Sequence, residues 1–131
     1  PKDSWLYANM QAALGIVYEH KGDILGAWMP LHDALLASSW STTAEAVPAA
    51  YACLKMCHDS FSKGVILAGN FGRDADTIGA IAGAILGAKY GLESIPPHWV
   101  EKTRYPSGTC LQFTKGVDLL EVGRKLASLI C

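Results

Sequence analysis

Two carboxylates and a hydroxyl stand close together at Asp74, Asp76 and Thr77, directly ahead of a long apolar segment. Oxygen ligands of this kind are the ones that Mg²⁺ and Mn²⁺ prefer. Two carboxylates this close repel each other unless a cation joins them. Gly72, just upstream, allows the backbone to approach a ligand closely. These residues together indicate a hard divalent cation bound at the start of a helix.

The simplest alternative needs no metal. One aspartate would cap the helix, and the other would face the positive end of the helix dipole. Acidic residues are enriched at helix starts, so the spacing of Asp74 and Asp76 alone favours this alternative. The added oxygen of Thr77, the flexible Gly72 and the repulsion between the carboxylates favour the metal.

The helix that carries these residues should run from Asp74 to about Tyr90, with Gly91 as its stop. A glycine at every fourth position, at residues 79, 83 and 87, costs about 1 kcal/mol each relative to alanine. Close packing must offset that cost. We therefore expect a central helix packed tightly on several sides, with its carboxylates at the floor of a cleft.

Helical periodicity continues along nearly the whole chain, so the predicted class is all-α, with residues 1–131 as a single helical domain. The periodicity predicts helices at residues 4–20, 24–38, 42–57, 60–70, 74–90, near 97–102 and at 117–130. Pro30 predicts a kink or early break in the second of these. The run VILAG at 65–69 is the one place where a strand competes.

The start of the third helix has two interpretations. Thr42 and Glu45 form a capping-box pattern, which predicts a helix that begins there. Pro48, three residues after Glu45, lacks the N–H that such a helix needs. Either the first turn is irregular, or the main helix begins at Pro48.

Composition excludes several classes of function. With 11 basic and 12 acidic side chains, the net charge is -1 and no basic stripe appears, so nucleic acid is not an expected partner. The apolar run at 78–88 is about half the ~20 residues of a membrane span. The four cysteines, Cys53, Cys57, Cys110 and Cys131, form no disulfide or zinc pattern. Buried thiols in a reducing cytoplasm are the expectation.

The stretch at 70–99, NFGRDADTIGAIAGAILGAKYGLESIPPHW, resembles the C-terminal signature of the ADP-ribosylglycohydrolase family. In that family Gly-x-Asp-x-Asp-Thr precedes a Gly/Ala-rich helix, which ends in Tyr-Gly and is followed by Ile-Pro and Trp. The resemblance is fainter over TAEAVPAAYACL and weakens over the first forty residues and the tail. Many relatives carry a second glycine where this chain has Arg73.

The resemblance implies a compact all-α helix bundle with a binuclear Mg²⁺ or Mn²⁺ centre. It implies hydrolysis of a bond at the anomeric carbon of ADP-ribose, in ADP-ribosylated proteins or related molecules. Carried onto this chain, Asp74, Asp76 and Thr77 are the expected metal ligands, and the two aspartates act in catalysis through the metal.

The segment ahead of the carboxylates is expected to contact substrate, through Asn70, Gly72 and Arg73. Relatives also draw metal ligands from an acidic cluster near the start of a longer chain, and the isolated acidic residues of 1–60 offer no counterpart. The chain is therefore expected to be the C-terminal portion of such an enzyme. It would need its N-terminal part, or a partner chain, and would be inactive alone.

Two other functions stay open at this point. A non-catalytic helical module could keep the family fold for binding or assembly. The doublets His32-Asp33 and His58-Asp59 are also typical of metal-dependent phosphohydrolases of the HD type. A haloacid dehalogenase nucleophile is set aside, because Ile78 occupies the place of its fifth-position Thr or Val.

Overall fold

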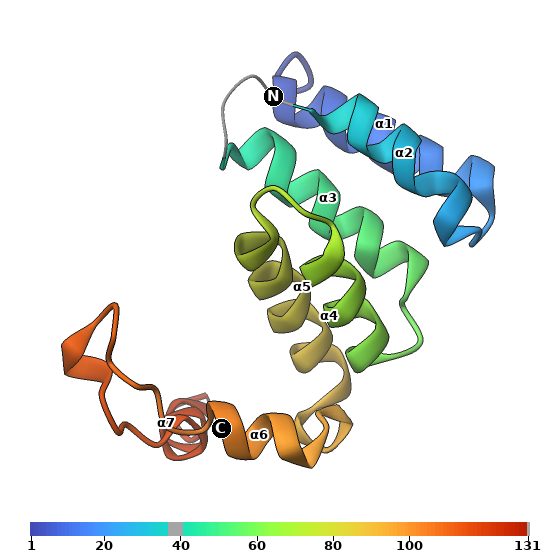
Figure 1. Cartoon of the computed structure of the whole chain (residues 1–131). Coiled ribbons are helices and arrows are strands. Elements are labelled where there is room, and N and C mark those ends of the chain that lie inside the picture. The colour runs from blue at the N-terminus through green and yellow to red at the C-terminus, as the bar shows by residue number, and fades with distance from the viewer. Residues whose placement is uncertain (37–40, 131) are drawn as a thin grey trace. The chain divides into compact units, whose positions relative to one another are not determined.

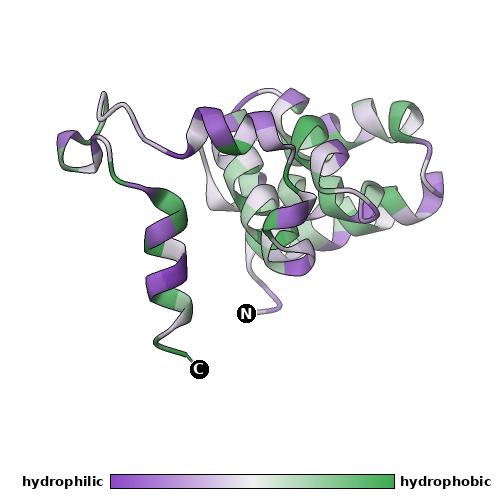
Figure 2. Cartoon of the chain, turned by 90° about the horizontal axis from the view of Figure 1, so that it is seen from below, coloured by the Kyte–Doolittle hydropathy of each residue, from purple (hydrophilic) through white to green (hydrophobic). Residues whose placement is uncertain are grey.

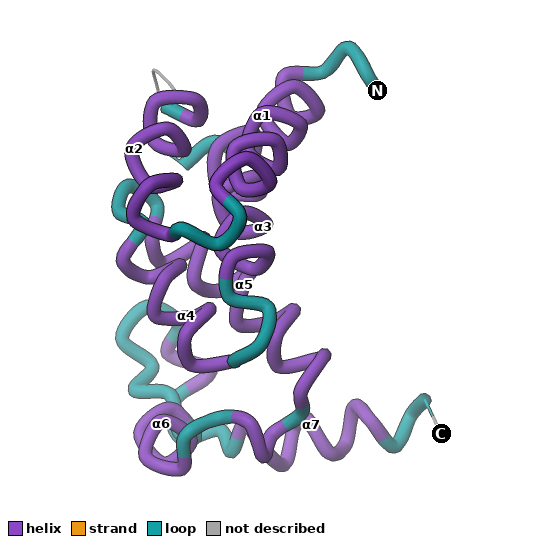
Figure 3. The backbone as a smooth tube through the Cα atoms, turned by 90° about the vertical axis from the view of Figure 1, so that its right-hand side faces the viewer, coloured by secondary structure: helices purple, strands orange, loops and turns teal. Residues whose placement is uncertain are grey.

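The computed structural model describes residues 1–36 and 41–130. The chain forms two compact units, residues 1–94 and 95–131. The described residues are 71% helix and contain no strand, as the tube of Figure 3 shows. The all-α prediction is confirmed.

Among its described residues, the first unit holds five α-helices, labelled in Figure 1, and a short 3₁₀ turn. Their bounds are α1 Trp5–His20, α2 Ile24–Leu35, α3 Thr43–Met56, α4 Phe61–Asn70, α5 Ala75–Tyr90 and η1 Leu92–Ser94. The strand considered for VILAG is wrong, because that run lies inside α4. Helix α2 continues through Pro30, so the early break predicted there is also wrong.

Local signals in the sequence set the ends of the first helices. The Ser4 hydroxyl accepts a hydrogen bond from the Tyr7 amide at the start of α1. Lys21 and Gly22 then take left-handed backbone angles, with φ of 48° and 90°, which end the helix. Asp23 caps α2 by accepting from the Gly26 amide at 3.0 Å. The break that the periodicity predicted between residues 20 and 24 is confirmed.

Pro48 lies inside α3, whose first turn begins at Thr43. A proline in a helix leaves the carbonyl four residues earlier without its N–H donor. That carbonyl belongs to Ala44, and the buried Asn9 of α1 donates to it from Nδ2 at 2.8 Å. A side chain from another helix thus replaces the missing bond, and α3 can start before its proline.

Helix α3 occupies the centre of the first unit. It packs against α1, α2, α4 and α5, and eight of its residues are buried. Most of these are alanines, which let four helices approach it closely. Helix α5, expected to be the central one, packs against α3 and α4, and its buried stripe is Ile78, Ala82 and Leu86. The prediction of a central α5 is therefore wrong.

The glycines of α5 face α4, which lies beside it in Figure 1. A Cβ built at Gly83 would meet the Val65 side chain at 3.7 Å, an ordinary contact. The tight position is on the other helix. A Cβ at the buried Gly64 of α4 would lie 2.4 Å from Cδ1 of Leu86. The glycines of α5 predicted that a neighbouring helix packs closely against it. The close packing of α4 against α5 depends instead on Gly64 of α4.

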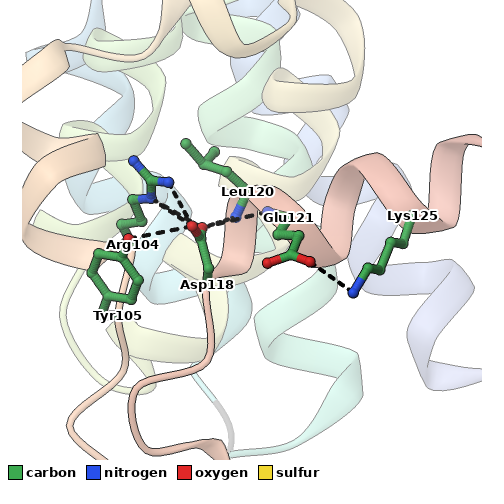
Figure 4. A network of polar contacts seen from close by, with 6 residues as sticks. All are labelled: Arg104, Tyr105, Asp118, Leu120, Glu121 and Lys125. Atoms are coloured by element: carbon green, nitrogen blue, oxygen red, sulfur yellow. Dashed lines mark hydrogen bonds and ion pairs between the residues drawn. The ribbon is translucent and has the colours of Figure 1, made fainter.

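The second unit holds α6 Pro97–Thr103, the 3₁₀ turn η2 Gln112–Thr114 and α7 Leu119–Ala127. Asp118 caps α7 through the amides of Leu120 and Glu121, and its carboxylate also binds the Arg104 guanidinium (Figure 4). That ion pair and the two amides hold the pKa of Asp118 well below its ordinary value. Helix α7, next to the C-terminus in Figure 2, is amphipathic, with bands of polar and apolar residues along it.

Two predictions from composition concern membranes and thiols. No helix in the described part of the chain is both long and apolar enough to span a bilayer. Cys53 and Cys57 are buried, as expected, whereas Cys110 is exposed, so the expectation of a buried thiol is wrong there; all three are free. Burial raises the pKa of the Cys53 thiol to about 12. Cys131 lies outside the described residues.

Candidate metal centre

Helix α5 begins with the three oxygen-bearing side chains that the sequence singled out. Asp74 is the N-cap residue, and its backbone carbonyl accepts from the Ile78 amide at 2.9 Å. Its side chain makes no capping hydrogen bond. Asp76 and Thr77 lie in the first turn and are exposed, whereas Asp74 is half-buried. The carboxylate of Asp74 is therefore not used as a cap, which removes part of the metal-free alternative.

The turn that delivers Asp74 has an unusual backbone. Gly72 and Arg73 both take left-handed angles, with φ of 85° and 53°. Glycine adopts such angles freely, but an arginine there costs about 1–3 kcal/mol unless its surroundings hold it in place. The interactions of Arg73 therefore decide where α5 can begin.

The side chain of Arg73 is held by Glu45 of α3. Its Nε and Nη2 both donate to the Glu45 carboxylate, Nη2 at 3.1 Å. Glu45 is 1% exposed, so its charge needs such a partner. The hydrogen bonds that the Arg73 guanidinium donates to the Glu45 carboxylate raise the pKa of Arg73. Arg73 was expected to contact substrate, but two of its nitrogens face Glu45.

The capping box predicted from Thr42 and Glu45 has a different arrangement. Thr42 is the N-cap of α3, but it makes no side-chain capping bond, and its Oγ1 is buried without a hydrogen-bond partner. Glu45 turns toward Arg73, which lies 28 residues further along the chain. The capping-box pattern predicted the start of α3 correctly. The capping hydrogen bonds that it predicted for the side chains of Thr42 and Glu45 are wrong.

The other end of the turn is held by aromatic and imidazole rings. Phe71 ends α4 and is 2% exposed. The ring of His32, on α2, stacks on it at 4.2 Å with an interplanar angle of 11°, and Trp28 packs against both. Nε2 of His32 lies 2.6 Å from the Phe71 carbonyl oxygen. In the sequence, His32 stands out only as part of an HD doublet.

Two other residues that the sequence singled out, Asn70 and His58, have local backbone partners. Asn70 is exposed and donates from Nδ2 to the Ile66 carbonyl at 2.8 Å, within its own helix. His58 is exposed, with Nδ1 3.3 Å from the Lys55 carbonyl oxygen. The two doublets of the HD alternative thus have separate surroundings, one packed on Phe71 and one at the surface.

The donor set fits a hard cation only in part. Two carboxylates and a hydroxyl at one helix start have the chemistry that Mg²⁺ or Mn²⁺ selects. Within the described residues, however, no group of three or more His, Cys, Asp and Glu side chains is arranged to hold a metal ion. Asp74, Asp76 and Thr77 could therefore hold a metal together with ligands from elsewhere.

Comparison with known proteins gives the family of the chain. The family model described as ADP-ribosylglycohydrolase matches residues 2–129. An ADP-ribosylarginine hydrolase of Pseudomonas putida is 43% identical over 47 residues, which are 36% of this chain and 13% of that protein. The ADP-ribosyl-[dinitrogen reductase] glycohydrolase of Rhodospirillum rubrum is 48% identical over 44 residues, 34% of this chain and 15% of that protein.

A longer alignment joins the chain to the uncharacterized protein YegU of Escherichia coli, 36% identical over 92 residues, or 70% of this chain and 27% of that protein. The matched segments thus span between about an eighth and about a quarter of these relatives. No solved structure gave a significant match. The family match extends well beyond the signature at 70–99, across both units. On this finding, the chain belongs to the ADP-ribosylglycohydrolase family.

Proposed function

We propose that this chain is the C-terminal portion of a metal-dependent hydrolase that cleaves the glycosidic bond of an ADP-ribosylated molecule. The observation that carries the proposal is the start of α5, where Asp74, Asp76 and Thr77 follow a turn held by Glu45 and Arg73. The family match and the names of the relatives support the same activity.

Each of the three side chains has a role in the proposal. Asp74, Asp76 and Thr77 hold Mg²⁺ or Mn²⁺, completed to a binuclear centre by an acidic cluster from the N-terminal part of the enzyme or from a partner chain. The bound metal supplies Lewis-acid and orienting chemistry at the anomeric carbon. The half-buried Asp74 carboxylate and the exposed Asp76 carboxylate would act in catalysis through the metal that they hold, by fixing its place beside the ribose and the attacking water. Gly72 leaves its backbone open to the ligand, and Asn70 and Arg73 lie near enough in sequence to contact it.

ADP-ribosylated arginine is the substrate we propose first. Relatives in two bacteria carry the name ADP-ribosylarginine hydrolase. Mouse ADP-ribosylhydrolase ARH3 is 37% identical over 65 residues, 42% of this chain and 18% of that protein, and its name specifies no linkage. ADP-ribose on a residue other than arginine is therefore the alternative substrate that we propose. Both linkages share the ADP-ribose group, and the two substrates differ in the leaving group alone.

A non-catalytic module is the second candidate function. The lack of a metal-binding group of three or more among the described His, Cys, Asp and Glu residues favours it. The two candidates differ in one respect that can be measured. The hydrolase needs an acidic cluster from another segment, whereas a binding module needs none.

The test uses the longer polypeptide that contains this chain. Asp76→Asn keeps the shape of the side chain and removes its charge, and Asp59→Asn makes the same change at an exposed residue paired with Lys63. We expect Asp76→Asn to weaken Mn²⁺ binding, measured by calorimetry, and to lose release of ADP-ribose from ADP-ribosylarginine. Asp59→Asn should leave both unchanged. Unaltered binding and turnover in Asp76→Asn would contradict the proposal.

The requirement for another segment has its own test. Residues 1–131 alone and the longer polypeptide are each assayed for release of ADP-ribose with Mg²⁺. We expect release by the longer polypeptide only. Release by residues 1–131 alone would overturn the half-site interpretation. Mn²⁺ binding without release by the longer polypeptide, on any ADP-ribosylated substrate, would favour the non-catalytic module.

A further inference from the structure

His32 of α2 stands where it can hold the end of α4. The last carbonyls of a helix have no partner inside the helix and must find donors elsewhere. Phe71 is the C-cap of α4, and its carbonyl oxygen lies 2.6 Å from Nε2 of His32. A carbonyl oxygen only accepts, so this contact is a hydrogen bond in the tautomer whose proton lies on Nε2. A histidine near a helix C-terminus also interacts favourably with the helix dipole.

The imidazole ring is itself fixed from two sides. Its Nδ1 lies 2.8 Å from the Trp28 carbonyl oxygen, one turn back in α2. Its face stacks on the Phe71 ring, and the Trp28 ring packs at 5.3 Å from the imidazole and 5.4 Å from Phe71. His32 therefore has little freedom to rotate. It contacts Phe71 through both the aromatic ring and the backbone carbonyl.

The residues after Phe71 are those whose backbone needs support. Gly72 and Arg73 take left-handed angles, and Asp74 begins α5 directly after them. Glu45 fixes the Arg73 end of this turn, and His32 fixes the Phe71 end. With both ends held, the direction in which α5 presents its first carboxylates is set by α2 and α3.

We infer that His32 is a positioning residue for the proposed metal centre, acting through its hydrogen bond to the Phe71 carbonyl. This inference rests on the proposed function. It assigns the HD doublet at 32–33 a role that differs from metal ligation, because the ring nitrogens of His32 face backbone carbonyls. His32 touches neither the proposed metal ligands nor, on this assignment, the reacting atoms.

The test compares His32→Gln with His32→Asn in the longer polypeptide. The amide nitrogen of glutamine reaches the place of Nε2, whereas that of asparagine reaches only the place of Nδ1. Both variants lose the stacked ring, so a loss due to packing alone appears equally in both. His58→Gln, at an exposed histidine of the same unit, is the control.

The first measurement needs no metal. Hydrogen exchange of the peptide that spans residues 71–77 reports how often the turn opens. We expect exchange about fivefold faster in His32→Asn, as for the loss of one net intramolecular hydrogen bond. His32→Gln should stay close to the wild type. Equal exchange in the two variants, or no change in either, would overturn the inference.

The second measurement is Mn²⁺ affinity, followed by the loss of the free-ion paramagnetic resonance signal. Residues that orient metal ligands typically change affinity by 10–100-fold, and we expect about tenfold weaker binding in His32→Asn with rescue by His32→Gln. Faster exchange in His32→Asn with unchanged Mn²⁺ affinity would also overturn the inference. If the wild type itself binds no Mn²⁺, the proposed metal centre fails, and the positioning role for it fails too, whatever the exchange data show about the turn.

Discussion

Removing the arginine from the Glu45–Arg73 pair tests whether a buried charge organises the start of α5. In Arg73→Met the aliphatic part of the side chain remains, but the Glu45 carboxylate loses the two nitrogens that now donate to it. The carboxylate cannot reach water, since the Glu45 side chain is 2% exposed. The loss of folding stability in Arg73→Met therefore comes mainly from the buried charge of Glu45.

The size of that cost follows from the burial of the two partners. Loss of one partner from a buried ion pair typically costs about 3–5 kcal/mol, because the other charge is left buried and unpaired. The Arg73 side chain is 22% exposed, so water screens part of the pair. We therefore expect about 3 kcal/mol for Arg73→Met, the lower end of that range.

The assay is urea unfolding of the longer polypeptide, for Arg73→Met and for the double variant Glu45→Met with Arg73→Met. The double variant removes both charges, and replacing a whole buried pair by apolar residues is often close to neutral, so we expect it within about 1 kcal/mol of the wild type. The double variant should still bind Mn²⁺ more weakly than the wild type, because the ion pair that holds position 73 is gone. The effect of the pair on the free energy of unfolding is thereby measured apart from its effect on the placement of the metal ligands.

Lys63→Met provides the matched control. Lys63 pairs with Asp59 at 3.6 Å, and both side chains are more than half exposed. Such surface pairs contribute about 0–1 kcal/mol, so the control should barely change the free energy of unfolding. The reasoning is refuted if Arg73→Met costs no more than Lys63→Met, or if the double variant is as unstable as Arg73→Met.

Three further predictions concern packing, acid and thiols. Gly83→Ala should raise the free energy of unfolding by about 1 kcal/mol through helix propensity, whereas Gly64→Ala should gain less or lose stability, both measured by urea unfolding. Because the pKa of Asp118 is depressed in the folded second unit, its charge adds stability above the ordinary aspartate pKa of about 3.9, and that stability is lost as pH falls toward the folded pKa. Arg104→Gln should return the pKa of Asp118, followed by NMR of its carboxyl carbon, toward the ordinary value; an unmoved titration would contradict the ion pair. Cys53, whose pKa burial raises to about 12, should resist thiol reagents at pH 8 until urea unfolds the chain, as mass spectrometry of the labelled peptides can check.

Local patterns predicted most of the helices and their ends. Ser4 and Asp23, which are residue types favoured at N-caps, cap the helices that follow them. Gly91 ends α5 with φ of 75°, as the sequence predicted. Capping and turn signals act over a few residues, which makes them legible in a linear sequence. Pro48 was ambiguous for the opposite reason, because the donor that makes it tolerable comes from Asn9 on another helix.

The packing of α5 was predicted less well, because a glycine pattern shows where a helix has no side chains and not what lies against it. The stripe at 79, 83 and 87 does face α4, but the tight contact belongs to Gly64. The two glycines of α4, Gly64 and Gly69, are five residues apart and form no helical stripe. The central place of α3 was likewise hidden, since its alanines form no marked amphipathic pattern.

The amino-acid sequence by itself determined the fold class, the family resemblance and the residues at the start of α5, because all three depend on residue types at short, regular spacings. Only the tertiary structure decided what holds those residues in place. Glu45 and His32 reach the turn at 71–73 from helices that lie 28 and 39 residues away along the chain. Folding brings these partners together to satisfy a buried charge and an unpaired carbonyl. In the unfolded chain water solvates both groups, so they require a protein partner only after folding has buried them.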